Sequence, residues 1–214
     1  MTGIVLIRSG SKSIKDKNVR IINGKPLVYW ILNALQNSKV SNIILSTDSN
    51  KYIEVIKSFE MNKVEIFKRS KINSKDESSS EDGIIELINE LKINDDIIFC
   101  QATSPLTNSS NINNAIELYK HFDSILSVVR QKRFIWGENG IPINYDYKTR
   151  PRRQDFKGFL VENGAIYISN SHDILESKCR ISGKIGLYEM DEASYFEIDE
   201  EKDFLIMQGL MKIS

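Results

Sequence analysis

The stretch Ile4-Val5-Leu6-Ile7-Arg8-Ser9-Gly10-Ser11-Lys12-Ser13 decides the fold class, because a buried apolar run leads directly into a polar turn. Short apolar runs bounded by turn residues predict buried strands. Similar runs recur at residues 43–45, 64–67, 97–100 and 125–129. Between these runs apolar side chains repeat about every 3.6 residues, which predicts helices within residues 26–35, 53–59, 84–91 and 112–119. Strands that alternate with helices indicate crossover units around a mostly parallel sheet.

We therefore predict an α/β protein with three layers, α/β/α, built on a mostly parallel Rossmann-like sheet of the nucleotide-binding type. The whole chain, residues 1–214, has the length of a single domain. Residues 131–157 interrupt the alternation with turn-forming and basic residues, and we interpret them as an inserted arm. Later strands are expected at residues 164–169 and 187–190, followed by a terminal helix at residues 200–212.

The composition excludes several classes of function. Lys plus Arg and Asp plus Glu both number 29, so the formal net charge is zero. This balance argues against a surface built for nucleic acid or for a membrane. No apolar run approaches the roughly 20 residues of a membrane helix, and the first residues lack the basic leader of a signal peptide. Cys100 and Cys179 lack metal-type spacing and are interpreted as buried free thiols. We expect a cytoplasmic protein without nucleic-acid or membrane partners.

The loop after the first strand is a candidate phosphate site. Ligands of open α/β sheets bind beyond the carboxyl ends of the strands. In this loop Gly10 lies between Arg8 and Lys12. A flexible backbone can offer N–H groups to phosphate oxygens, while arginine forks two oxygens and lysine acts as a point charge. A solvated basic loop is the alternative. The spacing is neither that of a Walker loop nor that of a dinucleotide fingerprint.

An acidic pair, Glu197 and Asp199, lies shortly before the terminal helix. We expect a strand here, whose alternation would place both carboxylates on one face. Adjacent carboxylates repel unless a cation or a proton separates them, and Mg²⁺ bound to phosphates takes one or two carboxylates. A solvated acidic helix start is the alternative. His121 ends a helix and His172 lies in a polar turn, so neither is expected to be catalytic.

Six motifs, in order along nearly the whole chain, resemble those of the acylneuraminate (CMP-N-acylneuraminate) cytidylyltransferases. They are Leu6-Ile7-Arg8-Ser9-Gly10-Ser11-Lys12 with Lys17-Asn18, Asn23-Gly24-Lys25-Pro26-Leu27, Ser46-Thr47-Asp48-Ser49, the Asp76 to Ser80 segment, Gln101-Ala102-Thr103-Ser104-Pro105-Leu106, and Asn163-Gly164-Ala165-Ile166-Tyr167-Ile168.

The resemblance implies a role for each matched residue. The nucleotide CTP would be bound by Arg8, Ser9, Gly10, Lys12, Lys17, Asn18, Ser79 and Ser80. The acidic sugar would be bound by Gln101, Thr103, Ser104, Arg153 and Tyr167, with Arg153 forking the sugar carboxylate. Arg8, Lys12 and Gln101 would carry the catalysis. Asp199 and Glu197 would bind Mg²⁺, with Mn²⁺ as a substitute. Core packing for Tyr167 and a strand-end cap for Gln101 are the structural alternatives.

The implied reaction transfers CMP from CTP to the anomeric hydroxyl of a sialic-acid-like nonulosonic acid and releases pyrophosphate. The alternatives are an enzyme for Kdo or another 2-keto-3-deoxy acid, one for another nucleotide, and an inactive nucleotide-binding homologue. A glycosyltransferase of similar architecture would need an Asp-x-Asp motif after a mid-sheet strand, which residues 46–49 do not supply. The resemblance also makes the arm a dimerisation element, so a homodimer is expected.

The chain departs from the family pattern at several positions. Ser13, Thr107 and Glu197 stand where glycine, arginine and aspartate are usual in the family. Arg180 and Ile181 stand where some sialic-acid members carry an aromatic pair that reaches the site of a neighbouring subunit. These last changes bear on which sugar is accepted more than on the reaction. N-acetylneuraminate, Kdn, legionaminate and pseudaminate all stay open as acceptors.

Overall fold

The computed structural model describes residues 1–10, 13–70, 73 and 78–213. Four residues of the predicted motifs lie outside the described residues, namely Ser11, Lys12, Asp76 and Glu77. No helix in the described part of the chain has both the length and the apolar character needed to cross a membrane.

A seven-stranded sheet forms the centre of the molecule, with strand order β5-β4-β1-β6-β8-β7-β9. Its strands are β1 Thr2–Leu6, β4 Asn42–Thr47, β5 Val64–Lys68, β6 Asp96–Cys100, β7 Ser124–Gln131, β8 Phe159–Asn170 and β9 Ile185–Met190. β8 runs antiparallel to both of its neighbours, and the other paired strands of this sheet are parallel. A short antiparallel pair, β2 Ile21–Ile22 and β3 Lys25–Pro26, lies apart from it. The predicted mostly parallel sheet is confirmed.

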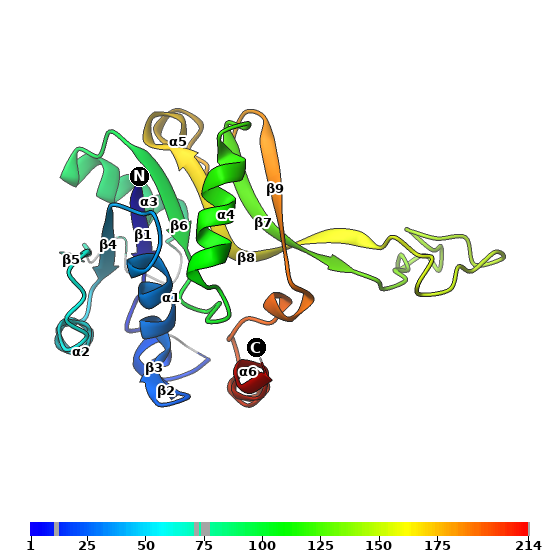
Figure 1. Cartoon of the computed structure of the whole chain (residues 1–214), viewed down its shortest axis with the longest axis horizontal. Helices are drawn as coiled ribbons and strands as arrows, with labels where there is room; N and C mark the ends of the chain where they lie inside the picture. Colours follow the sequence, from blue (N-terminus) through cyan, green and yellow to red (C-terminus); the bar gives the residue numbers. More distant parts are fainter. Residues whose placement is uncertain (11–12, 71–72, 74–77, 214) are drawn as a thin grey trace.

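Helices cover both faces of this sheet, as Figure 1 shows. On one face lie α1 Leu27–Gln36, α2 Asn50–Lys57 and α4 Ser109–Tyr119. Their apolar stripes share one buried cluster with Val5, Leu45 and Ile166 of the sheet. On the other face, α3 Ser80–Leu91 and α5 Ser171–Ser177 pack against Ile4, Phe99 and Tyr167. The three-layer arrangement is therefore confirmed, because burying both faces of the sheet needs a helical layer on each.

The C-terminal helix α6, Glu201–Ile213, packs beside the start of α1. Phe204 and Met207 of this helix are buried with Leu27 of α1 and with Ile14 and Ile22, which belong to the segment between the first turn and α1. Two 3₁₀ turns, η1 Lys17–Val19 and η2 Glu192–Tyr195, flank this region. The C-terminal segment is thus packed directly on the N-terminal loop.

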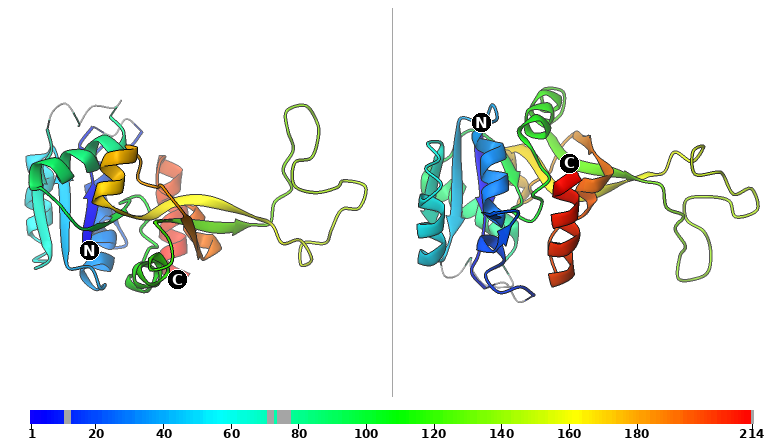
Figure 2. Two further views of the ribbon diagram at one scale, coloured as in Figure 1. Left: turned by 90° about the horizontal axis from the view of Figure 1, so that it is seen from above. Right: turned by 60° about the horizontal axis from the view of Figure 1, so that its bottom comes forward.

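The predicted arm occupies residues 132–158, between the end of β7 and the start of β8. It projects away from the body of the molecule (Figure 1), and the two further views show it clear of the helices (Figure 2). Within it, Phe134 packs against Tyr145 and Phe156, with ring centroids 4.2 and 4.9 Å apart. Trp136 and Ile143 of the arm are exposed.

The elements predicted from the sequence need four corrections. The arm begins one residue later than predicted, because Gln131 still pairs with Phe159 in the sheet. The late strand is longer than residues 164–169, and α5 was not foreseen because its seven residues are too short to show a helical period. The strand expected at Glu197–Asp199 is wrong: that segment has no regular structure.

Candidate active site

Three loops meet at one edge of the sheet, because β4, β1 and β6 are adjacent and parallel. Arg8 lies just beyond the end of β1, Asp48 follows β4 and Gln101 follows β6. The carboxyl ends of parallel strands form the usual ligand-binding edge of an α/β sheet. The structure therefore brings three of the sequence motifs to one place.

The turn after β1 is held in shape by polar contacts. Asp48 accepts hydrogen bonds from the backbone N–H of Ser9 at 2.9 Å and from its hydroxyl at 2.8 Å. The buried side-chain amide of Asn18 donates to the backbone carbonyl of Arg8 at 3.3 Å. A Cβ built on Gly10 would meet no heavy atom of the described residues within 4 Å. The turn is therefore anchored at its start and open at Gly10, where an anion could approach the backbone.

Arg69, which sequence analysis missed, lies behind this turn. It follows β5, is 7 % exposed, and its Nε has no hydrogen-bond partner among the described residues. Burial lowers the pKa of its guanidinium, the charges of Glu86 and Asp48 oppose this, and nearby Arg8 lowers it again. Two arginines therefore lie at this edge among the carboxylates of Glu86, Asp48 and Asp82, and a guanidinium group can bind the oxygens of an anionic ligand. The rule that loops after strands carry ligands, applied to β5, would have found Arg69.

The first turn of α3 reaches the same edge through its contact with Arg69. Ser79 is the N-cap: its hydroxyl accepts from the N–H of Asp82 at 3.0 Å, and the Asp82 carboxylate accepts from the N–H of Ser79 at 2.8 Å. This reciprocal capping box fixes the start of the helix. A Cβ at Gly83 would lie 2.7 Å from Nη2 of Arg69, so the glycine makes room for the arginine. Ser79 and Ser80 therefore stand at the positive end of a helix dipole, which favours anions.

Gln101 and Glu197 come together at Gly164 of β8. Gly164 has a φ of +68°, a conformation that glycine adopts at little cost. A Cβ built on it would lie 3.4 Å from Nε2 of Gln101 and 3.6 Å from Oε2 of Glu197. The Thr103 hydroxyl donates to Oε1 of Gln101 at 3.3 Å. The structure thus joins three motifs that are far apart in the sequence.

Backbone and ionic contacts hold the acidic segment in place. The buried Ile198 donates its N–H to the carbonyl of Thr103 at 3.1 Å. Lys17 donates its Nζ to the carbonyl of Ile198 at 2.9 Å and to Oδ1 of Asp199 at 3.1 Å. Arg20 adds a 2.6 Å contact to Glu201, and its guanidinium lies 4.4 Å from the ring centroid of Phe204. The packing of α6 on the N-terminal loop therefore sets the position of both carboxylates.

The electrostatics of Glu197 and Asp199 fit a divalent cation. Burial raises the pKa of Glu197, the charge of Asp199 raises it further, and Lys17 opposes both effects. A second positive charge at this place would relieve the repulsion, and carboxylate oxygens are hard ligands of the kind that Mg²⁺ prefers.

Three predicted sugar-binding residues are placed differently. Ser104 is 3 % exposed, and its hydroxyl has no partner in the described part of the chain. Tyr167 is 4 % exposed, packs in the core, and donates its hydroxyl to Glu162. Arg153 is exposed in the arm. Within one chain, the structure therefore does not bring Arg153 together with Gln101 and Glu197.

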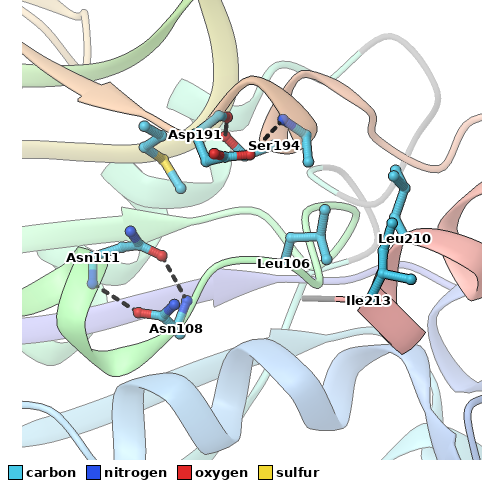
Figure 3. A pocket seen from close by; sticks show the side chains of 9 residues that line it. Leu106, Asn108, Asn111, Asp191, Ser194, Leu210 and Ile213 are labelled. Carbon is cyan, nitrogen blue, oxygen red and sulfur yellow. Dashed lines mark hydrogen bonds between the residues drawn. The ribbon is translucent and has the colours of Figure 1, made fainter.

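A separate cavity of about 360 Å³ lies between the start of α4, η2 and α6. Figure 3 shows Asn108 and Asn111 on one side of it and Asp191 and Ser194 on the other, with Leu210 of α6 beside it. The side chains of Asn108 and Asn111 are engaged in the capping box of α4. None of the predicted site residues lines this cavity. The arrangement of charges thus favours the sheet edge, not this cavity, as the catalytic centre.

Comparison with known proteins identifies the family of the chain. The family model described as cytidylyltransferase matches residues 2–210. The chain belongs to the cytidylyltransferase family. Its sheet and layers are similar to a solved CMP:2-keto-3-deoxy-manno-octonic acid synthetase complexed with CTP, with a TM-score of 0.71 at 14% identity over 99% of this chain and 98% of that one. At this identity the likeness shows the fold alone.

Several curated proteins are similar to this chain in sequence. The N-acylneuraminate cytidylyltransferase B of Danio rerio is 36% identical over 96% of this chain and 50% of its own length. An N-acylneuraminate cytidylyltransferase of Streptococcus agalactiae is 27% identical over 96% of this chain and 52% of its own length. The chain therefore spans about half the length of these relatives. The post-translational flagellin modification protein B of Campylobacter coli is 26% identical, and 93% of its length is covered.

Proposed function

We propose that this member of the cytidylyltransferase family transfers CMP from CTP to the anomeric hydroxyl of a sialic-acid-like nonulosonic acid and releases pyrophosphate. The observation that carries the proposal is the meeting of Arg8, the first turn of α3 and the Gln101–Glu197 pair at one sheet edge. Relatives named N-acylneuraminate cytidylyltransferases, at up to 36% identity, support the choice of acceptor.

In this proposal the nucleotide lies across the parallel half of the sheet. Arg8 binds the triphosphate, Arg69 adds positive potential behind it, and the open backbone at Gly10 approaches the phosphates. Ser79 and Ser80 place a helix N-terminus beside the nucleotide, which stabilises negative charge by roughly 0.3–1 kcal/mol. Lys17 and Asn18 close the pocket toward the acidic segment.

The acceptor hydroxyl attacks the α-phosphorus in line. A new P–O bond forms, the bond to the bridging oxygen breaks, pyrophosphate leaves with the electron pair, and the proton of the hydroxyl passes to solvent. Gln101, held by Thr103, positions the hydroxyl, while Arg8 balances the charge on the phosphate under attack. Positioning and preorganised charge supply most of the acceleration in reactions of this type. Asp199 and Glu197 would hold Mg²⁺, or Mn²⁺ in its place, and the bound ion would supply neutralisation of phosphate charge.

Product analysis tests this function. The purified chain is incubated with Mg²⁺, one of CTP, UTP, ATP or GTP, and one of N-acetylneuraminate, Kdn, legionaminate, pseudaminate or Kdo. We expect pyrophosphate and a CMP-sugar, seen by mass spectrometry, with CTP and a nonulosonic acid. Arg8→Ala should abolish transfer with an unchanged circular dichroism spectrum, whereas the exposed control Lys57→Ala should keep it. If product forms only with Kdo, the acceptor is an eight-carbon acid and not a nonulosonic acid. CTP binding without any product would indicate an inactive homologue.

We also propose a homodimer formed through the arm. Trp136, Ile141, Ile143 and Tyr147 are between 50 % and 68 % exposed on the arm, a large apolar surface for one short segment. Arg153 would then serve the sugar site of the partner subunit, since the arm projects away from the site of its own chain. Light scattering after size exclusion should give twice the chain mass, and Ile143→Glu should lower it to one chain. A wild-type monomer would end the idea of a shared site.

The same proposal places the chain in the cytoplasm. Cys100 is buried and Cys179 is half-buried, and both are free thiols, which suits a reducing compartment. Recovery of the tagged chain in the cytoplasmic fraction of its host would support the location, and recovery in a secreted or membrane fraction would overturn it.

A further inference from the structure

Arg180 and Glu81 form an ion pair between segments 99 residues apart in the sequence. The Glu81 carboxylate accepts from Nε of Arg180 at 2.6 Å and from Nη2 at 3.3 Å. The two side chains are only 22 % and 19 % exposed. A two-point contact between mostly covered partners is geometrically specific, unlike the mobile pairs common on protein surfaces.

The same guanidinium lies across two strands of the sheet. Its Cζ is 4.7 Å from the ring centroid of Tyr167 in β8 and 5.6 Å from that of Phe99 in β6. Phe99 and Tyr167 are register partners at the β6–β8 junction, where the strand direction reverses. Such cation–π contacts are attractive, and they are stronger when the partners are shielded from water. Arg180 therefore lies over the junction between β6 and β8, where parallel strand pairing gives way to antiparallel pairing.

Each end of this contact is fixed to a different half of the molecule. Beside Arg180, the backbone of Ser182 bonds to the Ser124 hydroxyl of β7, with contacts of 2.7 and 3.1 Å. Glu81 belongs to the first turn of α3, directly after Ser79 and Ser80. That turn packs on Leu6 and Arg69 through the close approach at Gly83. Arg180 thus ties the half that contains β7 and β8 to the half that contains β1 and β5.

These two halves carry different parts of the proposed site. Arg8, Asp48 and the first turn of α3 belong to the parallel half, where CTP would bind. Gly164, which faces Gln101 and Glu197, belongs to β8, where the acceptor would bind. In-line transfer needs the acceptor hydroxyl and the α-phosphorus within about 3–3.5 Å. The separation of the halves therefore matters for transfer, and much less for holding CTP alone.

We propose that Arg180, through Glu81 and Tyr167, is a positioning residue that sets the first turn of α3, and the nucleotide beside it, against the acceptor strand β8. The inference rests on the proposed function and deepens it. The pair also explains why both residues are charged. Removing either Glu81 or Arg180 would leave the other charge unpaired and largely buried, which costs far more than breaking an exposed ion pair.

Arg180→Met tests the proposal, because methionine keeps the apolar contact with Tyr167 and removes the charge. We expect kcat for transfer to fall about 10- to 100-fold while the Kd for CTP, measured by calorimetry, changes less than about threefold. Glu81→Gln should behave alike, and the reversed pair Glu81→Arg with Arg180→Glu should restore part of the lost kcat. The control is Arg130→Met, which breaks a similar two-point pair, Arg130–Glu189, at 2.8 and 2.7 Å on the outer β7–β9 strands.

The outcomes separate cleanly. An Arg180→Met kcat within about twofold of wild type, or an equal fall in Arg130→Met, would overturn the positioning role, since a 1 Å misplacement alone costs about 100-fold. If the wild-type chain transfers nothing, the proposed function fails. Amide hydrogen exchange then still tests whether the Arg180–Glu81 contact holds the first turn of α3 in place. Faster exchange of residues 78–84 in Arg180→Met and Glu81→Gln, absent in Arg130→Met, supports the contact. Unchanged exchange in both variants counts against it.

Discussion

Asp48 accepts two hydrogen bonds from Ser9, one from its backbone N–H at 2.9 Å and one from its hydroxyl at 2.8 Å. The contact joins the turn after β1 to the loop after β4 and uses up the first N–H that the turn could offer to a phosphate. Asp48→Ala should therefore loosen the turn and lower kcat/KM for CTP about 10- to 100-fold. Asp48→Asn keeps an acceptor for the N–H and a donor for the hydroxyl, so its kcat/KM should stay within about threefold of wild type. Steady-state pyrophosphate release measures both, and equal activity of wild type and Asp48→Ala would contradict the role.

Gly164 gives a sharper test of the acceptor side, because the chain contains a matched control. Gly164→Ala would place a methyl group 3.4 Å from the Gln101 amide and 3.6 Å from the Glu197 carboxylate, at a φ of +68°. Gly140 has a φ of +76°, and no heavy atom in the described part of the chain lies within 4 Å of its Cβ position. Both alanine variants should lose about 1 kcal/mol of unfolding free energy through the left-handed backbone.

Only Gly164→Ala should also lose activity, by about tenfold or more, since its methyl group fills the space between two positioning groups. Urea unfolding gives the shared loss of stability, and pyrophosphate release gives the difference in turnover. Equal turnover in the two variants would show that Gln101 and Glu197 do not act together.

The sequence alone predicted the positions of those strands and helices whose apolar residues form a regular local pattern. The strand runs of β1, β4, β5, β6 and β7 and the stripes of α1, α3 and α4 lie where periodicity predicts them, because each buries a continuous face of its own. Short elements gave no such signal. α5 has seven residues, and the acidic segment at Glu197 is irregular because its only buried side chain before the helix, Ile198, is held by backbone contacts to Thr103 and Lys17.

Part of the site was predictable from the rule that ligand-binding loops follow strands. Arg8, Asp48 and Gln101 are found by that rule, and the structure confirms that their loops meet. The contacts of Arg69 with Gly83 and of Arg180 with Glu81 join segments that are distant in the sequence. Because their proximity depends on strand order and helix packing, no local sequence pattern predicts these contacts. Arg153 shows the reverse case: its chemistry suits a carboxylate, but a single chain does not bring it to the site.

Gly83 and Gly209 are both helical glycines, and their surroundings predict opposite effects on stability. The new methyl group of Gly209→Ala in α6 meets none of the described atoms within 4 Å. This variant should raise the unfolding free energy by about 0.5–1 kcal/mol, the ordinary gain in helix propensity. At Gly83 the new methyl group would lie 2.7 Å from Nη2 of Arg69 and 2.8 Å from Cδ1 of Leu6. Overpacking costs about 1–3 kcal/mol, so Gly83→Ala should be destabilised on balance. Guanidinium unfolding compares them, and a stabilised Gly83→Ala would show that Arg69 moves aside freely.

Glu117 on α4 links stability to pH through two lysines. Hydrogen bonds from Lys120 and Lys39 lower the pKa of its carboxyl from 4.5 to about 2. Because the folded-state pKa lies below the unfolded value, the stabilising contribution is present above about pH 4.5 and is lost as the pH falls toward about 2. Wild type should therefore unfold at a higher urea concentration than Glu117→Gln at pH 7, and the gap should close on acidification.

This difference in urea concentration should be small, because the three side chains are 47 % to 62 % exposed. About 1 M NaCl should shrink it further by screening the charges. Lys39→Met should remove part of the gap, since Lys39 contributes one of the two contacts to Glu117, at 2.7 Å. A gap between wild type and Glu117→Gln that is constant from pH 7 to pH 3 and insensitive to salt would mean that the glutamate acts through packing, not through its charge.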